Sequence, residues 1–531
     1  MTDTVRDLLR RRVDDDRPGL LFEDVHWTWR EYVARSAGVC AGLDGHLDPD
    51  RPRHVGALLD NTPLMAVLVA GAGLGGFTLV GLNTTRRGEG LAADVRRSDC
   101  QVVVTEPRHA ALLDGLDLGG ATVLVASDDS LPDAPSAAPL PDRSPATDDL
   151  MMLIFTSGTS GDPKAVRITH EKVAFPGLML AERFGLGADD VCYLSMPLFH
   201  SNAVMAGWAP ALASGAAIAL ARRFTASGFL PDVRRFGVTY ANYVGKPLTY
   251  VLATHEQPDD TDNPLRLVFG NEAAERDIEA FGRRFGCVVV DSYSSTENAV
   301  IVQRVPEMPG GSLGRPLDGV EVLDPESGER VPDAVFDGAG RLLNGEDAIG
   351  ELVNTQGAGF FAGYYNDPDA DAERMRDGMY WSGDLAYRDA DGFVYFAGRS
   401  GDWLRVDGEN LATAPIERAL LRHPDVSEVA VYAVPDESGV GDAVMAALVL
   451  HDGRQFDPDG FASFLAGQPD LGSKSAPRFV RVARELPRTP THKVLKRVLT
   501  EQTVTGHRDP VWSRAPRAMS YEPRPGGSMA P

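Results

Sequence analysis

A loop rich in small hydroxyl and glycine residues carries the strongest chemical signal in the sequence. An apolar strand from Leu153 runs into Thr156–Gly161, and Lys164 follows. Small side chains leave backbone amides exposed and let a chain of phosphates approach closely, while a lysine adds a point charge. The spacing differs from GxxxxGK[ST], and the residues after the lysine alternate with period two, so the loop joins two strands. The pattern predicts a phosphate-binding loop; the alternative is an ordinary Ser/Gly hairpin loop.

Lysine is scarce in this chain, which makes the lysine after the loop more informative. Of 52 basic residues 46 are arginine, and the six lysines are Lys164, Lys172, Lys246, Lys474, Lys493 and Lys496. Such a bias is expected of a GC-rich genome. A compact ammonium can enter and leave a phosphate site more readily than a planar guanidinium, so a motif that retains lysine indicates a function for it.

The composition excludes several classes of protein. The chain has 531 residues, too many for one core, and its 76 acidic against 52 basic residues give a net charge of −24. This balance argues against sequence-independent binding of nucleic acid and against docking on anionic lipid, because both depend on clustered Lys and Arg. Four distant cysteines without a CxxC predict neither a zinc site nor a disulfide framework. Together with a charged N-terminal stretch that resembles no signal peptide, they favour a cytoplasmic protein.

The longest uncharged run, residues 64–85, is long enough for a membrane span. Five glycines interrupt it, and Gly75–Gly76 divides it into a helix-like and a strand-like half. We therefore expect a buried helix followed by a core strand, and no integral membrane segment. The run also spells GxGxxG at Gly71, Gly73 and Gly76. A dinucleotide site needs the strand before the helix, so packing glycines are the favoured interpretation.

Strand-like apolar runs alternate with helical stretches through the first 400 residues. Runs such as 265–270 and 287–293 are typical of buried, mostly parallel strands between helices. Residues 127–149, rich in Pro, Ser, Ala and Asp, are predicted to be a flexible surface connection. Past residue 400 a smaller unit follows, with strands at 428–436 and 443–450. We predict an α/β fold with a large N-terminal domain of mostly parallel sheets packed with helices, and a small α+β C-terminal domain.

The loop TSGTSGDPK closely resembles the phosphate loop of the acyl-adenylate-forming superfamily, which includes acyl-CoA synthetases, peptide-synthetase adenylation domains and firefly-type luciferases. The resemblance extends over five ordered motifs, from about residue 20 to 500. It implies that Lys164 acts in catalysis, that the small domain is mobile, and that ATP is bound by Thr156, Ser157, Gly158, Thr159, Ser160 and Gly161.

The segment DSYSSTEN, residues 291–298, is similar to the family's Tyr-Gly-x-Thr-Glu. By resemblance Tyr293 flanks the adenine, Thr296 contacts the α-phosphate in catalysis, and Glu297 helps to hold Mg²⁺, which prefers hard oxygen ligands. Ser294 stands where glycine is usual, so a side chain there is expected to crowd the acyl entrance or to add a hydrogen bond. The implied nucleotide site also includes Ser292 and Ser294 and, from LVFGNEAAE, Gly270, Asn271 and Glu272.

Residues 381–399, WSGDLAYRDADGFVYFAGR, match the family's Gly-Asp…Gly-Arg segment. The resemblance implies that Asp384 binds both ribose hydroxyls and that Arg399 assists. Gly401 takes the position of the hinge about which the small domain swings, and glycine tolerates either backbone conformation. The expected domains are 1–398 for AMP and acyl binding, 399–402 as hinge, 403–510 as the small catalytic-lysine domain, and 511–531 as a disordered tail.

LPRTPTHKVLKR, residues 486–497, matches the C-terminal catalytic-lysine motif. The resemblance implies that Lys493 reaches the substrate carboxylate and the α-phosphate during adenylation. His492 replaces the usual glycine, which leaves the approach geometry less defined than the identity of the lysine. His200, in MPLFHSN, stands where the family places an aromatic residue or a histidine near the acyl carboxylate. A structural histidine is the alternative interpretation there.

The implied activity is that of an AMP-forming acid–thiol ligase, an acyl-CoA synthetase that uses ATP, Mg²⁺ and CoA as co-substrate. RVDGEN, residues 405–410, is closest to the fatty acid transport protein and very-long-chain acyl-CoA synthetase branch, so a long-chain or bulky acid is expected. An acid from secondary metabolism, passed to a carrier protein or partner enzyme, is the alternative. A catalytically inactive binding protein is disfavoured because the nucleotide-contacting positions look intact. The sequence does not decide between a monomer and a homodimer.

Overall fold

The computed structural model describes residues 3–127, 130–131, 134–156, 163–293, 295–305, 307–338, 341–399, 403–406, 409–435, 442–468, 471, 475–488, 494–515, 518 and 520–524. Contacts divide the chain into two compact units. The first unit comprises residues 1–299 and 358–373, and the second comprises residues 300–357 and 374–531.

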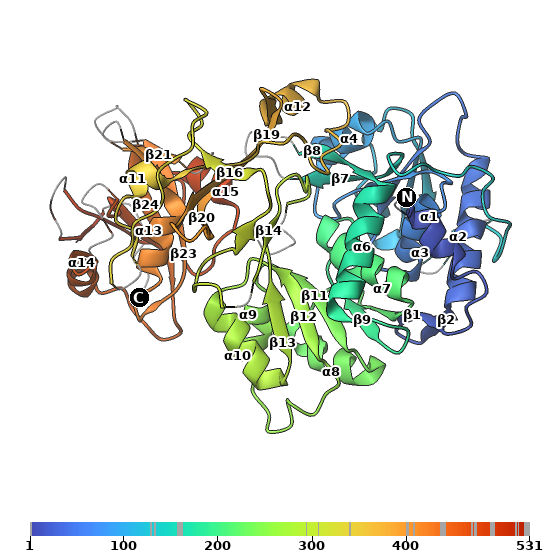
Figure 1. Ribbon diagram of the computed structural model, residues 1–531, viewed down its shortest axis with the longest axis horizontal. Helices are drawn as coiled ribbons and strands as arrows, with labels where there is room; N and C mark the ends of the chain where they lie inside the picture. The colour runs from blue at the N-terminus through green and yellow to red at the C-terminus, as the bar shows by residue number, and fades with distance from the viewer. Residues whose placement is uncertain are drawn as a thin grey trace. The chain divides into compact units, whose positions relative to one another are not determined.

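The first unit contains a seven-stranded sheet in which all neighbours are parallel except the hairpin pair β1 and β2. Helices α8 (Ala226–Phe236), α9 (Pro247–Leu252) and α10 (Glu275–Phe285) lie beside this sheet (Figure 1). They bury apolar side chains against it. In spatial order the strands are β13 (Val288–Asp291), β12 (Leu267–Asn271), β11 (Tyr240–Val244), β9 (Val191–Leu194), β10 (Ala217–Leu220), β1 (Pro18–Phe22) and β2 (Val25–Thr28).

Helix α6 (His170–Phe184) packs beside η1 (Ala203–Trp208), a π-helix, and α7 (Ala209–Ser214) in the same unit. Gly177 of α6 allows this close approach, because a Cβ there would lie 2.8 Å from the Ala209 carbonyl oxygen. The other described helices of the first unit are α1 (Val5–Arg10), α2 (Trp29–Asp44), α3 (Pro63–Gly73), α4 (Gly88–Arg97), α5 (Pro107–Ala110) and α12 (Pro368–Arg374), whose last residue falls in the second unit.

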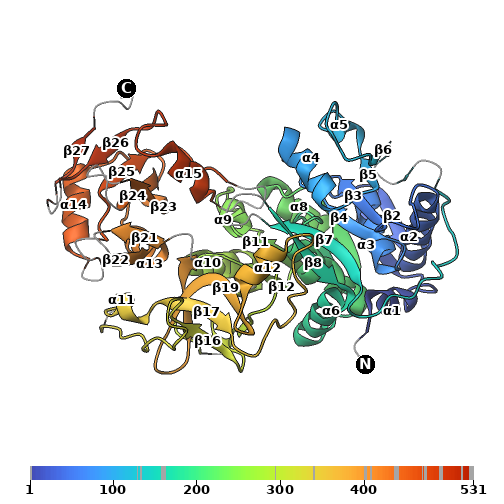
Figure 2. The same cartoon turned by 90° about the horizontal axis from the view of Figure 1, so that it is seen from above.

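A second sheet of the first unit has six strands, and only β7 and β8 run antiparallel. Thr156 pairs with Lys164 across β7 and β8, which confirms that the predicted phosphate loop joins two strands. Helices α3 and α4 lie beside this sheet (Figure 2). The strands, in spatial order, are β6 (Thr122–Val125), β5 (Val102–Thr105), β3 (His54–Leu58), β4 (Thr78–Gly81), β7 (Leu150–Thr156) and β8 (Lys164–Thr169).

The uncharged run at residues 64–85 forms α3 followed by β4, as the sequence predicts. Thr62 caps the helix by accepting from the Met65 N–H, and Pro63 occupies its first turn. All of α3 is buried in the protein. Among the described residues, no helix combines the length and the apolar character that a bilayer crossing requires.

The second unit contains an antiparallel sheet of β16 (Val320–Leu323), β17 (Gly350–Asn354), β19 (Met379–Arg388), β18 (Met375–Arg376) and β20 (Val394–Arg399). A second five-stranded sheet follows, with β23 (Val426–Pro435), β24 (Asp442–Leu450), β25 (Phe479–Val482), β26 (Val511–Ser513) and β27 (Glu522–Pro523). Its shorter elements are β14 (Val302–Gln303), β15 (Arg315–Pro316), α11 (Gly345–Ala348), β21 (Trp403–Val406), β22 (Glu409–Ala412), α13 (Thr413–Leu420), α14 (Pro458–Ala466) and α15 (Lys496–Gln502).

The structure differs from the sequence-based prediction at the C-terminal end. The segment after residue 510, predicted to be a disordered tail, contributes β26 and β27, and Tyr521 is buried with its hydroxyl donating to the Pro477 carbonyl. Composition suggested a tail, but an aromatic side chain buries a large apolar area, and the buried Tyr521 hydroxyl has the hydrogen-bond partner that such a group usually finds. The predicted division of the chain at 399–402 stays a prediction, since residues 400–402 lie outside the described ranges.

Candidate active site

Three parallel strands end side by side where the sequence places two of the nucleotide-binding segments. Gly270 of β12 pairs with Tyr243 of β11 and with Asp291 of β13. The carboxyl ends of parallel strands share one edge of a sheet, so the segments that follow them begin next to each other. Asn271 donates from Nδ2 to the Ser292 carbonyl at 2.6 Å and to Ser292 Oγ at 3.0 Å. The structure thus brings two of the predicted segments together.

A chain of amide side chains, absent from the sequence-based site, underlies this edge. Asn271 accepts from Asn202 Nδ2 at 3.2 Å, and Asn202 accepts from Asn242 Nδ2 at 2.6 Å. Asn242 and Asn271 are buried, and burying an amide costs free energy unless it is hydrogen-bonded. The amides therefore fix the start of η1 against β11 and β12. No local sequence pattern predicts these three amides, because they come from three separate segments.

Thr296 and His200 also lie near each other in the first unit. Ser201, the neighbour of His200, places its Oγ 2.9 Å from Thr296 Oγ1. The His200 ring packs on Phe199 with the ring centroids 4.6 Å apart. Tyr293, predicted to flank the adenine, is half-buried in the same segment as Thr296.

The backbone adopts unusual conformations at this edge. Glu272 has φ +69° and Asn298 has φ +53°, the left-handed region that residues with a side chain rarely adopt. Gly270 is glycine for another reason, since a Cβ there would lie 2.2 Å from the Tyr243 carbonyl oxygen. Strained residues of this kind cluster at functional sites, and both of these adjoin residues assigned from the sequence.

Two side chains that the sequence left unassigned hold Glu297. The hydroxyl of Tyr364 donates to Glu297 Oε1 at 3.0 Å, and Lys172 donates from Nζ to the Glu297 carbonyl oxygen at 2.8 Å. Lys172 is 0% exposed, and burial lowers its pKa to about 7, opposed by the negative charge of Glu297. The scarcity of lysine in the chain is the one signal that could have singled out Lys172.

Lys164, which follows the predicted phosphate loop, contacts residues from the end of the first unit. Its Nζ lies 2.8 Å from a Glu373 carboxylate oxygen and 5.3 Å from the centre of the Tyr364 ring. Tyr364 therefore lies between the loop lysine and Glu297. Of the loop itself, Thr156 is described at the end of β7, whereas Ser157, Gly158, Thr159, Ser160 and Gly161 lie outside the described residues.

Asp384 and Arg399 belong to the second unit and face each other across a hairpin. The register of β19 and β20 pairs them, and Arg399 Nε lies 3.3 Å from Asp384 Oδ1. Asp384 is buried, with 8% of its surface exposed. The predicted ribose-binding pair is thus a cross-strand pair. Three further predicted residues, Ser294, Gly401 and Lys493, lie outside the described residues, as does His492.

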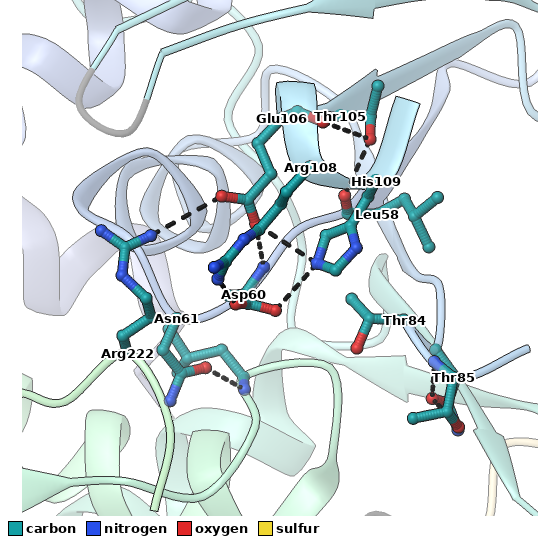
Figure 3. Close-up of polar contacts among 12 residues, drawn as sticks. Leu58, Asp60, Asn61, Thr84, Thr85, Thr105, Glu106, Arg108, His109 and Arg222 are labelled. Atoms are coloured by element: carbon teal, nitrogen blue, oxygen red, sulfur yellow. Dashed lines mark hydrogen bonds and ion pairs between the residues drawn. The ribbon is translucent and has the colours of Figure 1, made fainter. Parts of the chain in front are cut away.

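A separate cluster in the first unit has side chains of metal-ligand type. Ligand atoms of Asp60, Glu106 and His109 lie within 4.8 Å of one another. Figure 3 shows Arg108 and Arg222 beside them. The Arg108 guanidinium lies 2.5 Å from the Asp60 carboxylate, and the Arg222 guanidinium lies 3.6 Å from the Glu106 carboxylate. Each carboxylate therefore already faces a guanidinium, which would repel a cation. The cluster fits an ion-pair network that ties the start of α5 to the loop after β3.

Comparison with known families identifies the class of protein. Residues 10–365 match the family described as AMP-binding enzyme, and residues 415–493 match the AMP-binding enzyme C-terminal domain. This chain belongs to the AMP-binding enzyme family. Membership confirms the superfamily that the phosphate loop and the four later motifs predicted.

The chain is similar to several named relatives over most of its length. Medium/long-chain-fatty-acid–CoA ligase FadD17 of Mycobacterium marinum is 54% identical over 96% of this chain and 98% of its own. Steroid-22-oyl-CoA synthetase of Rhodococcus jostii is 48% identical over 94% of this chain and 91% of its own. Long-chain fatty acid transport protein 2 of Rattus norvegicus is 31% identical, covering 93% and 84%. The predicted class, an AMP-forming acid–thiol ligase, is confirmed, and a carrier protein as acceptor is not favoured.

Solved structures of the family share the fold. ATP-bound MatB from Rhodopseudomonas palustris aligns with a TM-score of 0.81 at 24% identity, covering 94% of this chain and 99% of that one. The anthranilate CoA ligase AuaEII in complex with anthranoyl-AMP aligns with a TM-score of 0.78 at 21% identity, covering 94% and 97%. The predicted α/β fold, with mostly parallel sheets in the large N-terminal part and a smaller C-terminal part, is confirmed.

Proposed function

We propose that this protein is an ATP-dependent acyl-CoA ligase for a long-chain or bulky carboxylic acid. The observation that carries the proposal is the similarity, over more than nine-tenths of the chain, to one ligase named for medium- and long-chain fatty acids and another named for a steroid-22-oyl group. Both names describe a carboxylate attached to a large apolar body. An experiment must therefore distinguish between two candidate substrates, a fatty acid and a steroid side-chain acid.

In the first half-reaction the acid's carboxylate attacks the α-phosphorus of ATP, which gives an acyl-adenylate and pyrophosphate. Catalysis of such a step is mainly positioning and charge neutralisation. We assign the loop Thr156–Gly161 to the phosphates, with positive charge from Lys164 and Lys493. Thr296 donates its hydroxyl to the α-phosphate, and His200 lies by the acyl carboxylate. The neighbouring side chains of Ser201 and Thr296 support this assignment.

The later motifs supply the remaining residues that we assign to the nucleotide. We assign Asp384, assisted by Arg399, to the ribose hydroxyls, since a carboxylate accepts from two hydroxyls at once. Tyr293 stacks on the adenine, and the backbone and side chains of the two strand-end segments line the nucleotide: Gly270, Asn271, Glu272, Ser292 and Ser294. The hydrogen bonds between Asn271 and Ser292 support a shared site for these two segments.

The donor set at Glu297 fits Mg²⁺. A carboxylate next to the Thr296 hydroxyl offers hard oxygen ligands, and Mg²⁺ in phosphate sites is bound by one or two carboxylates plus the phosphates. When bound, the ion neutralises charge on the phosphates. Tyr364 engages Glu297 Oε1, and the carboxylate has a second oxygen to offer.

In the second half-reaction the thiol of CoA attacks the acyl carbon and AMP leaves. The small domain turns near Gly401 and withdraws Lys493 between the two steps. Since the attacking thiol belongs to CoA, the protein need not supply a nucleophile. This agrees with cysteines that burial keeps unreactive: burial raises the pKa of Cys40 and of Cys100 to about 12.

A panel of carboxylic acids tests the proposal. Pyrophosphate release is measured with purified protein, MgATP and CoA, against palmitate, a shorter fatty acid and a steroid C22 acid, and the CoA thioester is identified by mass. We expect release and thioester formation with at least one of these acids and none with acetate. No release with any acid, or release without thioester until a carrier protein is added, would contradict it.

We place the protein in the cytoplasm. Its four cysteines, Cys40, Cys100, Cys192 and Cys287, are free thiols in the structure, as expected in a reducing compartment. Fractionation of cells that express the tagged chain, with a periplasmic and a membrane marker, measures this directly. Light scattering on the purified protein measures whether it is a homodimer.

A further inference from the structure

Glu297, whose carboxylate we assign to Mg²⁺, is contacted by two residues from segments far away in the sequence. Lys172 is the third residue of α6, and Tyr364 lies in the segment that returns to the first unit near its end. Lys172 contacts the backbone of Glu297 at 2.8 Å, and Tyr364 contacts its side chain at 3.0 Å. One contact fixes where the residue sits, and the other fixes where its carboxylate points.

Lys172 and Tyr364 are both connected to β8. The Tyr364 backbone forms an antiparallel bridge with Val166. Gly363 accepts from the Arg167 N–H, and the Tyr365 N–H donates to Ala165. β8 begins at Lys164 and is followed directly by α6, which carries Lys172. The loop lysine, the backbone bridge to Tyr364 and Lys172 therefore all belong to one continuous strand–helix segment. A strand with an added backbone partner is stiff enough to hold side chains in place.

The chemistry of Lys172 indicates more than packing. An ammonium removed from water costs free energy unless a partner compensates it, and lysine is almost never fully buried without one. Lys172 is 0% exposed, and its partner is Glu297. An apolar residue of similar length would fill the same space without that cost. Retaining a buried cation at this cost indicates that the position of the Glu297 backbone matters.

We propose that Lys172 and Tyr364 are positioning residues that fix Glu297 for Mg²⁺, an inference that rests on the proposed function. Tyr364 donates to one carboxylate oxygen and so directs the other toward the cation. Lys172 holds the backbone next to Asn298, whose φ of +53° keeps this turn in a strained conformation. Tyr364 also lies under the Lys164 ammonium, so it couples the phosphate loop to the metal ligand.

Tyr364→Phe is the decisive variant, because it removes one hydroxyl and keeps the ring. Tyr365→Phe is its matched control: the adjacent tyrosine donates to Asp99 at 2.9 Å, away from Glu297. Lys172→Met removes the charge at similar length, and Lys172→Arg restores a cation. Calorimetry measures ATP binding to each protein in Mg²⁺ and in EDTA. Pyrophosphate exchange measures the Mg²⁺ concentration for half-maximal rate.

We expect Tyr364→Phe to weaken ATP binding in Mg²⁺, and to raise the half-maximal Mg²⁺ concentration, about tenfold, as for loss of one hydrogen bond to a charged group. Binding in EDTA stays at the wild-type value. Lys172→Met shows the same selective loss, Lys172→Arg recovers part of it, and Tyr365→Phe responds to Mg²⁺ as wild type does.

A Tyr364→Phe protein that binds ATP as wild type does in Mg²⁺ overturns the proposal, and so does equal weakening in Mg²⁺ and in EDTA. If Lys172→Met does not fold, the Tyr364→Phe result decides alone. Binding in Mg²⁺ needs no acid substrate. An enzyme that turns over none of the acids therefore contradicts the proposed function, while its binding data still test the two positioning residues.

Discussion

The ammonium of Lys164 lies 2.8 Å from the carboxylate of Glu373 in the first unit. The lysine side chain is 11% exposed and the glutamate side chain 65%. The charge that follows the phosphate loop is therefore matched by a carboxylate at the protein surface. A triphosphate that binds Lys164 has to compete with this carboxylate.

Glu373→Gln should lower the KM for ATP, because the competing negative charge is gone. Ion pairs with an exposed partner contribute ~1 kcal/mol or less, so the decrease should be at most about fivefold, with little change in the unfolding temperature. Initial rates of pyrophosphate release over a range of ATP concentrations measure it. Lys164→Met serves as the opposite case and should raise the KM. A raised KM in Glu373→Gln would show that the pair assists binding.

Asp384→Asn should weaken ATP binding. If the carboxylate accepts from the ribose hydroxyls, removing its charge should cost about 1.5–3 kcal/mol, or roughly 10–100-fold in KM for ATP. The matched control is Asp389→Asn, in the same hairpin, where the carboxylate accepts from the Phe393 N–H and the Tyr395 hydroxyl. That control should lower the unfolding temperature and leave the KM alone. Equal KM values for ATP in Asp384→Asn and Asp389→Asn would contradict the assignment of Asp384 to the ribose.

Lys493→Ala should separate the two half-reactions. Loss of one preorganised charge contact typically costs ~3–4 kcal/mol, so acid-dependent pyrophosphate exchange should fall by roughly 10²–10³ or more. A supplied acyl-adenylate should still be converted to the thioester, because Lys493 has left the site by then. Lys496→Ala, three residues on, is the control: in the structure Lys496 pairs with Glu417. Unchanged exchange in Lys493→Ala would exclude this lysine from adenylation.

Acid should destabilise the fold through His170. Burial lowers the pKa of this histidine from 6.5 to about 4. Below pH 6.5 the unfolded chain binds a proton that the folded protein does not take up until near pH 4, so stability is lost as the pH falls through this window. The loss is on the order of 3 kcal/mol at the lower end. Unfolding temperatures from pH 7.5 to 4.5 should fall less steeply in His170→Gln than in wild type; parallel curves would contradict the assignment.

Much of the first unit's architecture could be predicted from the sequence, because a parallel strand that is buried on both faces appears as a short, uninterrupted apolar run. The runs at 265–270 and 287–293 became β12 and β13, and the strand-like half of 64–85 became β4. The C-terminal segment was harder. Its proline and glycine content resembles that of a tail, yet Tyr521 is buried and Trp512 packs into the core of the second unit.

The sequence by itself determined the family of this protein and predicted the parts of its site: a phosphate loop with a retained lysine, an aromatic–hydroxyl–carboxylate segment, an Asp–Arg pair and a C-terminal lysine. These signals are local, since each motif holds its residue types at fixed spacing. Only the tertiary structure decided which distant side chains contact the residues of these motifs, as at Glu297. Tyr364 meets Glu297 across 67 residues, and Lys172 meets it across 125. Such contacts depend on how separate strands and helices pack, and spacing along the chain carries no record of that.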